Sequence, residues 1–128
     1  MARTATPSLG VDLVELPRAR RFVREHASRL NGYFHPSEIR ILNEHRDPAR
    51  GAAVVLAAKE SVFKATPGSV WMGVDGFRRV RVSRASDGSL RAASTDGRRW
   101  RLWARLTPRY ALAVCTAEGR KDGSCAGI

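Results

Sequence analysis

The chain has 128 residues, the size of one domain that can bury a core without metal or disulfide support. Its formal net charge of +11 indicates an acidic partner, which could be a nucleic acid, an anionic surface or an acidic protein. A coding bias toward arginine, with the side chains serving only solubility, would explain the charge equally well. No run approaches the ~20 apolar residues of a membrane span and no secretory signal is present, so we expect a soluble, cytoplasmic protein.

The first expected element is a strand over residues 8–14, whose apolar content predicts a buried position. Asp12 is the one acid inside this segment. A carboxylate in such a strand requires a partner, because an isolated charge is costly to remove from water. Asp12 is therefore a candidate functional residue.

A helix is expected next, since Pro17 suits a first helical position, where a missing N–H costs nothing. We expect this helix to run to about Leu30. Arg18, Arg21 and Arg24 recur along it at three-residue spacing. One exposed side of the helix is therefore strongly basic.

Two further helices are predicted before the strands begin. A short one should start at Pro36, with Glu38 in its first turn, where a negative charge suits the helix dipole. The longer one has the clearest signals, because Asp47 is a suitable N-cap and Pro48 a suitable first residue. We expect it to run to about Ala65 and to be buried on most sides, since its middle turns are apolar all round.

This central helix carries the charged residues of greatest interest. The chain has 20 arginines but only three lysines, and Lys59 and Lys64 both lie in this apolar run. Glu60 and Lys64 are four residues apart, so they share one helix face, whereas Lys59 lies about 100° round the axis. A solvated Glu–Lys pair on an ordinary amphipathic helix would have the same pattern. The presence of Asp12 favours a metal site over a solvated pair. Asp12 and Glu60 together supply two oxygen ligands, as is typical of Mg²⁺ held jointly by protein and substrate phosphates.

A turn of small residues is expected directly after the central helix, at residues 66–69. Gly68 and Ser69 would present backbone N–H groups near Lys64, which suits a phosphate. The same residues are equally typical of any helix end. A phosphate-binding role and a purely structural role therefore both remain open.

The rest of the chain predicts strands that alternate apolar and polar residues, at 77–83, 90–94, 100–106 and 110–116. Together with the first strand they predict an antiparallel sheet packed on the central helix. The fold class is therefore α+β, with one domain over residues 1–128. Residues 1–7 and 119–128 are expected to be loose.

Two separated motifs resemble those of the 4′-phosphopantetheinyl transferases, and within them the short holo-acyl-carrier-protein synthase type. The first motif is Gly10–Val11–Asp12 followed by Glu15 and Arg18, and the second is the run from Leu56 to Lys64. Two weaker matches are Tyr33–Glu38, similar to the family's helix start, and Tyr110–Val114, similar to its closing strand. The resemblance spans roughly residues 9–118.

The resemblance implies the family's α+β fold and a homotrimer with the active site between neighbouring subunits. It implies Mg²⁺-dependent transfer of 4′-phosphopantetheine from coenzyme A to a serine of an acyl or peptidyl carrier protein, with release of 3′,5′-ADP. Asp12 and Glu60 would hold the metal. Glu60, or a metal-bound water beside it, would accept the serine proton, and Lys64 would contact or protonate the leaving phosphate.

Further roles concern substrate binding. Lys59 is expected to bind a coenzyme A phosphate. The resemblance supports Arg18 as a contact of the carrier protein, which is acidic around its modified serine. The helical spacing extends this expectation to Arg21 and Arg24, which would flank the site and attract the acidic carrier protein as it approaches.

The chain also departs from the family pattern. Leu56 replaces the motif's aromatic residue and Val55 the arginine that often precedes it, so part of the usual coenzyme A or carrier contact could be missing. A family member without transfer activity is one alternative. Another is a non-enzymatic basic module that binds nucleic acid, although Trp100 alternates as a core residue and only Trp103 falls on the arginine side of its strand.

Overall fold

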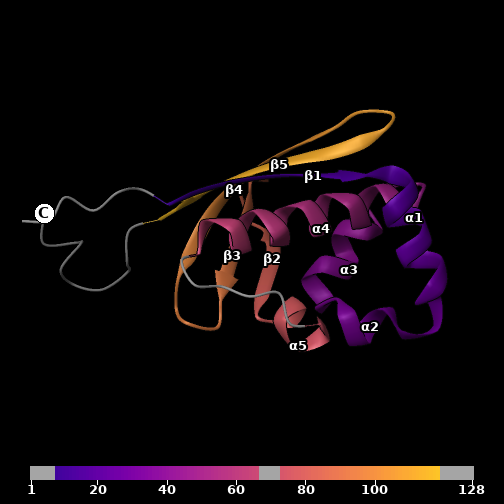
Figure 1. The fold of residues 1–128 in the computed structure, drawn as a ribbon, viewed down its shortest axis with the longest axis horizontal. Coiled ribbons are helices and arrows are strands. Elements are labelled where there is room, and N and C mark those ends of the chain that lie inside the picture. Colours follow the sequence, from indigo (N-terminus) through magenta and orange to yellow (C-terminus); the bar gives the residue numbers. More distant parts are fainter. Residues whose placement is uncertain (1–7, 67–72, 119–128) are drawn as a thin grey trace, which may run out of the picture.

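The computed structural model describes residues 8–66 and 73–118, which form one antiparallel sheet with helices on one face (Figure 1). The strands, in their order across the sheet, are β1 (Leu9–Glu15), β5 (Tyr110–Ala117), β4 (Arg99–Leu106), β3 (Leu90–Ser94) and β2 (Val80–Arg84). The helices are α1 (Leu16–Glu25), the 3₁₀ turn η1 (Ala27–Arg29), α2 (Leu30–Tyr33), α3 (Pro36–Leu42), α4 (Pro48–Ala65) and α5 (Gly73–Arg78). This arrangement confirms the predicted α+β fold with its antiparallel sheet.

Helix α4 lies along the inner face of the sheet and contacts β1, β5, β4 and β2, as well as α1 and α3 (Figure 1). It begins and ends where the sequence predicted, and its N-cap Asp47 accepts a hydrogen bond from the Ala49 N–H at 3.0 Å. Small residues let its neighbours approach closely, since a Cβ atom on Gly51 would lie 2.6 Å from the Cα of Leu42. No helix within residues 8–66 or 73–118 combines the length and apolar character that crossing a bilayer requires.

The first helix is shorter than predicted. Helix α1 ends at Glu25, and the chain continues through η1 and α2 where the sequence predicted one helix to about Leu30. His26 leaves the helical conformation, and its ring centroid lies 4.6 Å from that of Phe22 and 4.3 Å from that of Tyr33. This aromatic packing folds α2 back toward α1, so tertiary contacts override the local preference for a longer helix.

The segment before β2 also differs from the prediction. Phe77 and Arg78 end α5, and β2 begins only at Val80, whereas a strand was expected from residue 77. The Phe77 ring is buried, with its centroid 5.4 Å from that of Phe34 and 5.9 Å from that of Phe22. Phe77 therefore anchors α5 in the aromatic cluster and belongs to no strand.

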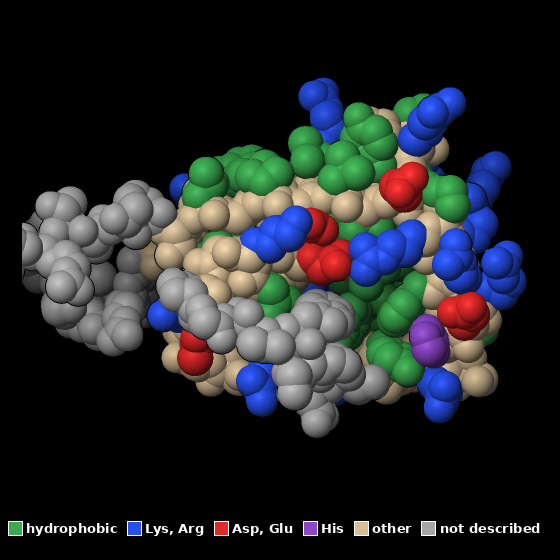
Figure 2. Space-filling view, in the orientation of Figure 1, with side chains coloured by type: hydrophobic (Ala, Val, Ile, Leu, Met, Phe, Trp, Pro, Cys, Tyr) green, Lys and Arg blue, Asp and Glu red, His purple; other side chains and the backbone are tan. Residues whose placement is uncertain are grey.

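Strand β1 is buried on one face only, where its composition predicted burial throughout. Leu9, Val11 and Leu13 point away from α4 and are 46–60% exposed. Trp103 lies on the same side of the sheet, since it pairs with Val114, which in turn pairs with Val11. We call the surface formed by these five residues the apolar outer face. Figure 2 shows apolar side chains as a band over β1 and β5.

Candidate active site

Asp12 reaches helix α4 because β1 runs very close to that helix. A Cβ atom on Gly10 would overlap the carbonyl oxygen of Ser61 and lie 3.0 Å from the Cβ of Ala65. Side chains two residues apart in a strand point to the same face, so Asp12 faces α4 as Gly10 does. The glycine thereby places the Asp12 carboxylate beside the last turns of α4.

Four charged side chains meet at this position. Lys64 donates a hydrogen bond to the Asp12 carboxylate, and Arg18 donates to both carboxylate oxygens of Glu60 at 3.1 and 3.2 Å. Figure 2 shows acidic side chains flanked by basic ones below the apolar band. The structure thus brings together Asp12, Glu60 and Lys64, and it adds Arg18, which the sequence associated with the carrier protein.

The charges around Glu60 and Lys64 suit proton transfer. Burial raises the pKa of Glu60, the Arg18 guanidinium opposes that rise, and the adjacent Asp12 carboxylate reinforces it. A hydrogen bond to Asp12, together with its negative charge, raises the pKa of Lys64. A carboxylate with a raised pKa is a better proton acceptor, and an ammonium group held protonated can bind an anion or donate to it.

The paired carboxylates of Asp12 and Glu60 fit a hard divalent cation. They are oxygen ligands from two different elements, and two cationic side chains already lie against them. Within the described ranges, no third His, Cys, Asp or Glu side chain joins them to form a metal-binding group. Mg²⁺ commonly takes one or two protein carboxylates and completes its shell with water and substrate phosphates. Their role as metal ligands remains a prediction.

Lys59 lies in the interior of the fold. Its side chain is completely buried, with Nζ 3.1 Å from Oε2 of Glu38, and it donates a hydrogen bond to the carbonyl oxygen of Phe77 at 2.7 Å. Burial lowers the pKa of Lys59 to about 8, while the Glu38 carboxylate opposes that shift. This geometry corrects the expectation that Lys59 binds a coenzyme A phosphate, because the ammonium group is enclosed by the protein.

Glu38 has a larger role than the helix-dipole role that the sequence suggested. Its carboxylate also accepts the backbone N–H groups of His35 at 2.8 Å and Val82 at 2.7 Å. The pair with Lys59 therefore connects α3, α4 and β2 through one buried cluster. The signal that could have found it is the lysine itself, because an ammonium group inside an apolar helix requires a buried acid.

The other predicted site residues fall into two groups. Arg21 and Arg24 are exposed on α1, near the Arg18 side chain that binds Glu60. Gly68 and Ser69 lie outside the described residues, so their phosphate-binding role remains a prediction.

A cavity of about 240 Å³ opens beside Arg18 and combines an apolar wall with charged groups. Leu56 forms part of that wall, at the position where the family motif has an aromatic residue. The full lining is Arg18, Arg21, Phe22, Glu25, Leu56 and Phe77. Arg18 therefore borders both the cavity and the charged cluster.

Comparisons with known proteins identify the family to which the chain is similar. Residues 8–115 match the family model of the 4′-phosphopantetheinyl transferase superfamily. A holo-[acyl-carrier-protein] synthase of Thermus thermophilus is 32% identical over 129 residues, covering 91% of this chain and 96% of that protein. One of Deinococcus radiodurans is 35% identical over 77 residues, covering 60% of this chain and 54% of that protein.

Solved structures share the fold. The holo-[acyl-carrier-protein] synthase of Neisseria meningitidis has a TM-score of 0.69 at 23% identity and covers 87% of this chain and 97% of its own. The Helicobacter pylori enzyme, solved in complex with coenzyme A, has a TM-score of 0.69 at 19% identity and covers 86% and 99%.

Proposed function

Because the chain belongs to the 4′-phosphopantetheinyl transferase superfamily, we propose that it transfers 4′-phosphopantetheine from coenzyme A to a serine of an acyl or peptidyl carrier protein. The products are the modified carrier protein and 3′,5′-ADP. The observation that carries this proposal is the meeting of Asp12, Glu60 and Lys64 beside the last turns of α4. The T. thermophilus relative, which covers 91% of this chain, supports the same activity.

In this reaction the serine hydroxyl oxygen attacks the phosphorus that bears the pantetheine group. The bond from that phosphorus to the bridging oxygen breaks, and the bridging oxygen leaves on 3′,5′-ADP. Glu60 is the best candidate to accept the serine proton, because its raised pKa favours protonation. Lys64, whose side chain is 61% exposed, would bind or protonate the leaving phosphate.

Asp12 and Glu60 would hold Mg²⁺ in this scheme. When bound, the metal polarises the attacked phosphorus and offsets negative charge on the leaving group. Arg18 and Lys64 lie on the same carboxylates, so both cationic side chains would have to move aside to expose the carboxylate oxygens. Their departure would free Arg18 for the carrier protein and Lys64 for the leaving phosphate.

The basic side of α1 would receive the carrier protein. Arg21 and Arg24 are exposed on the helix that also carries Arg18, and Arg21 lines the cavity beside it. An acidic surface around the target serine would be attracted to these arginines, and such rim charges set the encounter rate and register more than the chemistry.

We place the contacts of a homotrimer at the apolar outer face. Val11, Leu13 and Trp103 are 46–54% exposed there, and contiguous exposed apolar side chains of this size indicate an interaction surface. Strand β1 carries Asp12 on its other face, so a contact at Val11 would set the site close to the neighbouring copy. This supports the arrangement that the family resemblance implies, with sites between subunits.

The decisive experiment incubates the protein with coenzyme A, Mg²⁺ and an apo carrier protein, followed by mass spectrometry of the carrier. We expect the mass of one phosphopantetheine to appear, and to be lost with a carrier whose target serine is alanine. Lys64→Met should slow the transfer, whereas Arg40→Gln, a change at an exposed arginine of α3, should not. If none of several apo carrier proteins were modified, the chain would be a family member without transfer activity, and the proposal would be refuted.

A further inference from the structure

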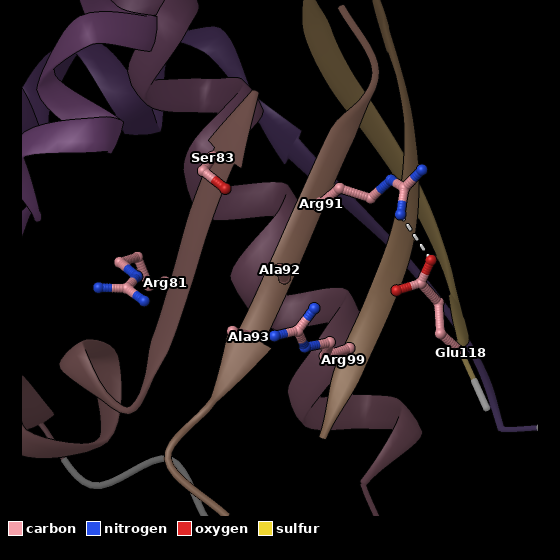
Figure 3. A pocket seen from close by; sticks show the side chains of 7 residues that line it. All are labelled: Arg81, Ser83, Arg91, Ala92, Ala93, Arg99 and Glu118. Carbon is pink, nitrogen blue, oxygen red and sulfur yellow. Dashed lines mark hydrogen bonds and ion pairs between the residues drawn. The ribbon is translucent and has the colours of Figure 1, made fainter. Parts of the chain in front are cut away.

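The outer side of β2, β3 and β4 carries an arginine-lined groove that none of the roles above uses. The groove has a volume of about 230 Å³, and its lining includes Arg81, Ser83, Arg91, Ala93, Arg99 and Glu118 (Figure 3). We call it the arginine groove. Its strands face α4 with Val80, Val82 and Trp100, so the groove opens on the side of the sheet away from that helix.

The register of the sheet builds the groove. Ala93 in β3 pairs with Arg81 in β2 on one side and with Arg99 in β4 on the other. Two strand spacings put the two arginine backbones roughly 9.5 Å apart, with only a methyl group between them. Figure 3 shows the Arg99 side chain reaching toward Ala93. The small residue leaves room between the arginines for a third group.

The charge of the groove is not balanced within the described residues. Glu118 is the one carboxylate in the lining, and it is already engaged by Arg91 at 2.6 Å and by Arg101 at 3.7 Å. Neither Arg81 nor Arg99 has a side-chain hydrogen bond or an ion pair within the ranges that the structure describes. Neither guanidinium group is therefore neutralised by an anion among these described residues.

We propose that the arginine groove binds a phosphate group held between Arg81 and Arg99. Guanidinium groups present planar pairs of N–H donors that match phosphate oxygens, and Ser83 adds a hydroxyl to the lining. A volume of about 230 Å³ is below the ~300 Å³ at which pockets for drug-sized ligands begin. The groove therefore has room for a phosphate group, while part of a larger ligand would lie outside it.

This site is separate from the charged cluster of the same chain. Arg81 lies in β2 and Asp12 in β1, which are the two edges of the sheet, and the two sites open on opposite faces. The proposal therefore stands whether or not the chain transfers phosphopantetheine. Free phosphate and the phosphate of a nucleotide share the chemistry that the groove recognises.

The test titrates the ¹⁵N-labelled protein with inorganic phosphate and follows backbone amides by NMR. We expect the Ala93 amide to shift as phosphate is added. Phosphate binding should be at least about tenfold weaker in the double variant Arg81→Gln/Arg99→Gln, because both substitutions remove charge-assisted hydrogen bonds. The control is Arg40→Gln/Arg46→Gln, which removes the same charge from exposed positions outside the groove and should bind as the wild type does. Parallel titrations with 3′,5′-ADP then distinguish a nucleotide phosphate, which binds more tightly than phosphate, from the free ion.

Three results would overturn the proposal. An Ala93 amide that does not move with either ligand excludes binding at the groove. Equal weakening in the Arg40/Arg46 control would mean that the net charge alone attracts phosphate. A shift at Ala93 produced by an acidic carrier protein but by neither phosphate ligand would make the groove a protein-docking surface.

Discussion

Lys59 and Glu60 are consecutive residues, yet their side chains serve different parts of the molecule. Lys59 extends into the interior, where its Nζ lies 3.1 Å from Glu38, whereas Glu60 reaches the surface and binds Arg18. The turn of the helix separates two neighbouring charges into one group that holds the fold and one that belongs to the candidate site.

The buried pair leads to a prediction about stability. Lys59→Met should lower the free energy of unfolding by about 3–5 kcal/mol, because it leaves the Glu38 carboxylate buried without its cation. Urea unfolding followed by circular dichroism measures this. The double variant Lys59→Met/Glu38→Gln should recover part of the loss, since the amide oxygen can still accept the Val82 N–H. A double variant less stable than Lys59→Met would contradict this account.

The pH dependence of the same variants checks the direction of the pKa shift. The pKa of Lys59 is lowered to about 8 from an ordinary 10.5, so the unfolded chain holds this proton more tightly than the folded one. The wild type should therefore gain stability relative to Lys59→Met as the pH rises from about 8 to 10.5. A constant difference between the two proteins over that range would mean that the pKa is not lowered.

Asp12→Asn and Glu60→Gln should each weaken Mg²⁺ binding and transfer by at least about 100-fold, because two carboxylates share one cation and a neutral amide is a poor replacement. Calorimetry with Mg²⁺ in the absence of a carrier protein measures the binding, and circular dichroism checks that the fold is kept. Full Mg²⁺ affinity in either variant would remove that residue from the metal site.

Arg18→Gln should raise the pKa of Glu60 further above its ordinary value, because the guanidinium group that favours the charged carboxylate is gone. A ¹³C NMR titration of the side-chain carboxyl of Glu60 reports this directly. Arg20→Gln is the matched control, since Arg20 lies in the same helix but binds Asp47. A pKa that falls, or that shifts equally in the control, would show that Arg18 does not govern Glu60.

Arg21→Glu with Arg24→Glu should raise the KM for the carrier protein by roughly tenfold or more, with little change in the KM for coenzyme A. The pair is chosen to spare Arg18, whose replacement would also disturb Glu60. The difference between variant and wild type should shrink at high salt, because exposed charges are screened. If the KM for coenzyme A rose in its place, the basic side of α1 would belong to the nucleotide site.

Val11→Glu should dissociate the proposed homotrimer by placing a charge in the apolar outer face. Light scattering coupled to size-exclusion chromatography measures the mass of the particle. Arg46→Glu, a charge change at an exposed position away from that face, should leave the assembly intact. A wild type that is monomeric at all concentrations would refute the assembly.

The parts of the fold that local signals determine were predictable. Asp47 and Pro48 define the start of α4 because capping and the missing proline N–H act within one turn, and the helix ends at Ala65, with Thr66 as its C-cap. The spacing likewise predicted that Glu60 and Lys64 lie on one face of the helix, because four residues make about one helical turn.

The parts that depend on distant partners were not predictable from a single chain. The end of α1 depends on His26 packing against Tyr33, and the burial of Lys59 depends on Glu38, which lies 21 residues earlier in the chain. Strand β1 was misjudged for a related reason. An apolar residue such as Val11 has the same sequence signal whether a helix covers it or it lies exposed on the outer face.

The close contact between Gly10 and Ser61 sets the position of β1, and thereby the position of the Asp12 carboxylate in the candidate site. A side chain at Gly10 would push β1 outward, and Asp12 would move with it, away from Glu60. Stabilising substitutions elsewhere cannot bring Asp12 back to Glu60, because the substitution at Gly10 changes the distance between the two carboxylates and not only the stability of the fold. Directed evolution of this enzyme should therefore find no tolerated substitution at Gly10, even in a strongly thermostabilised background.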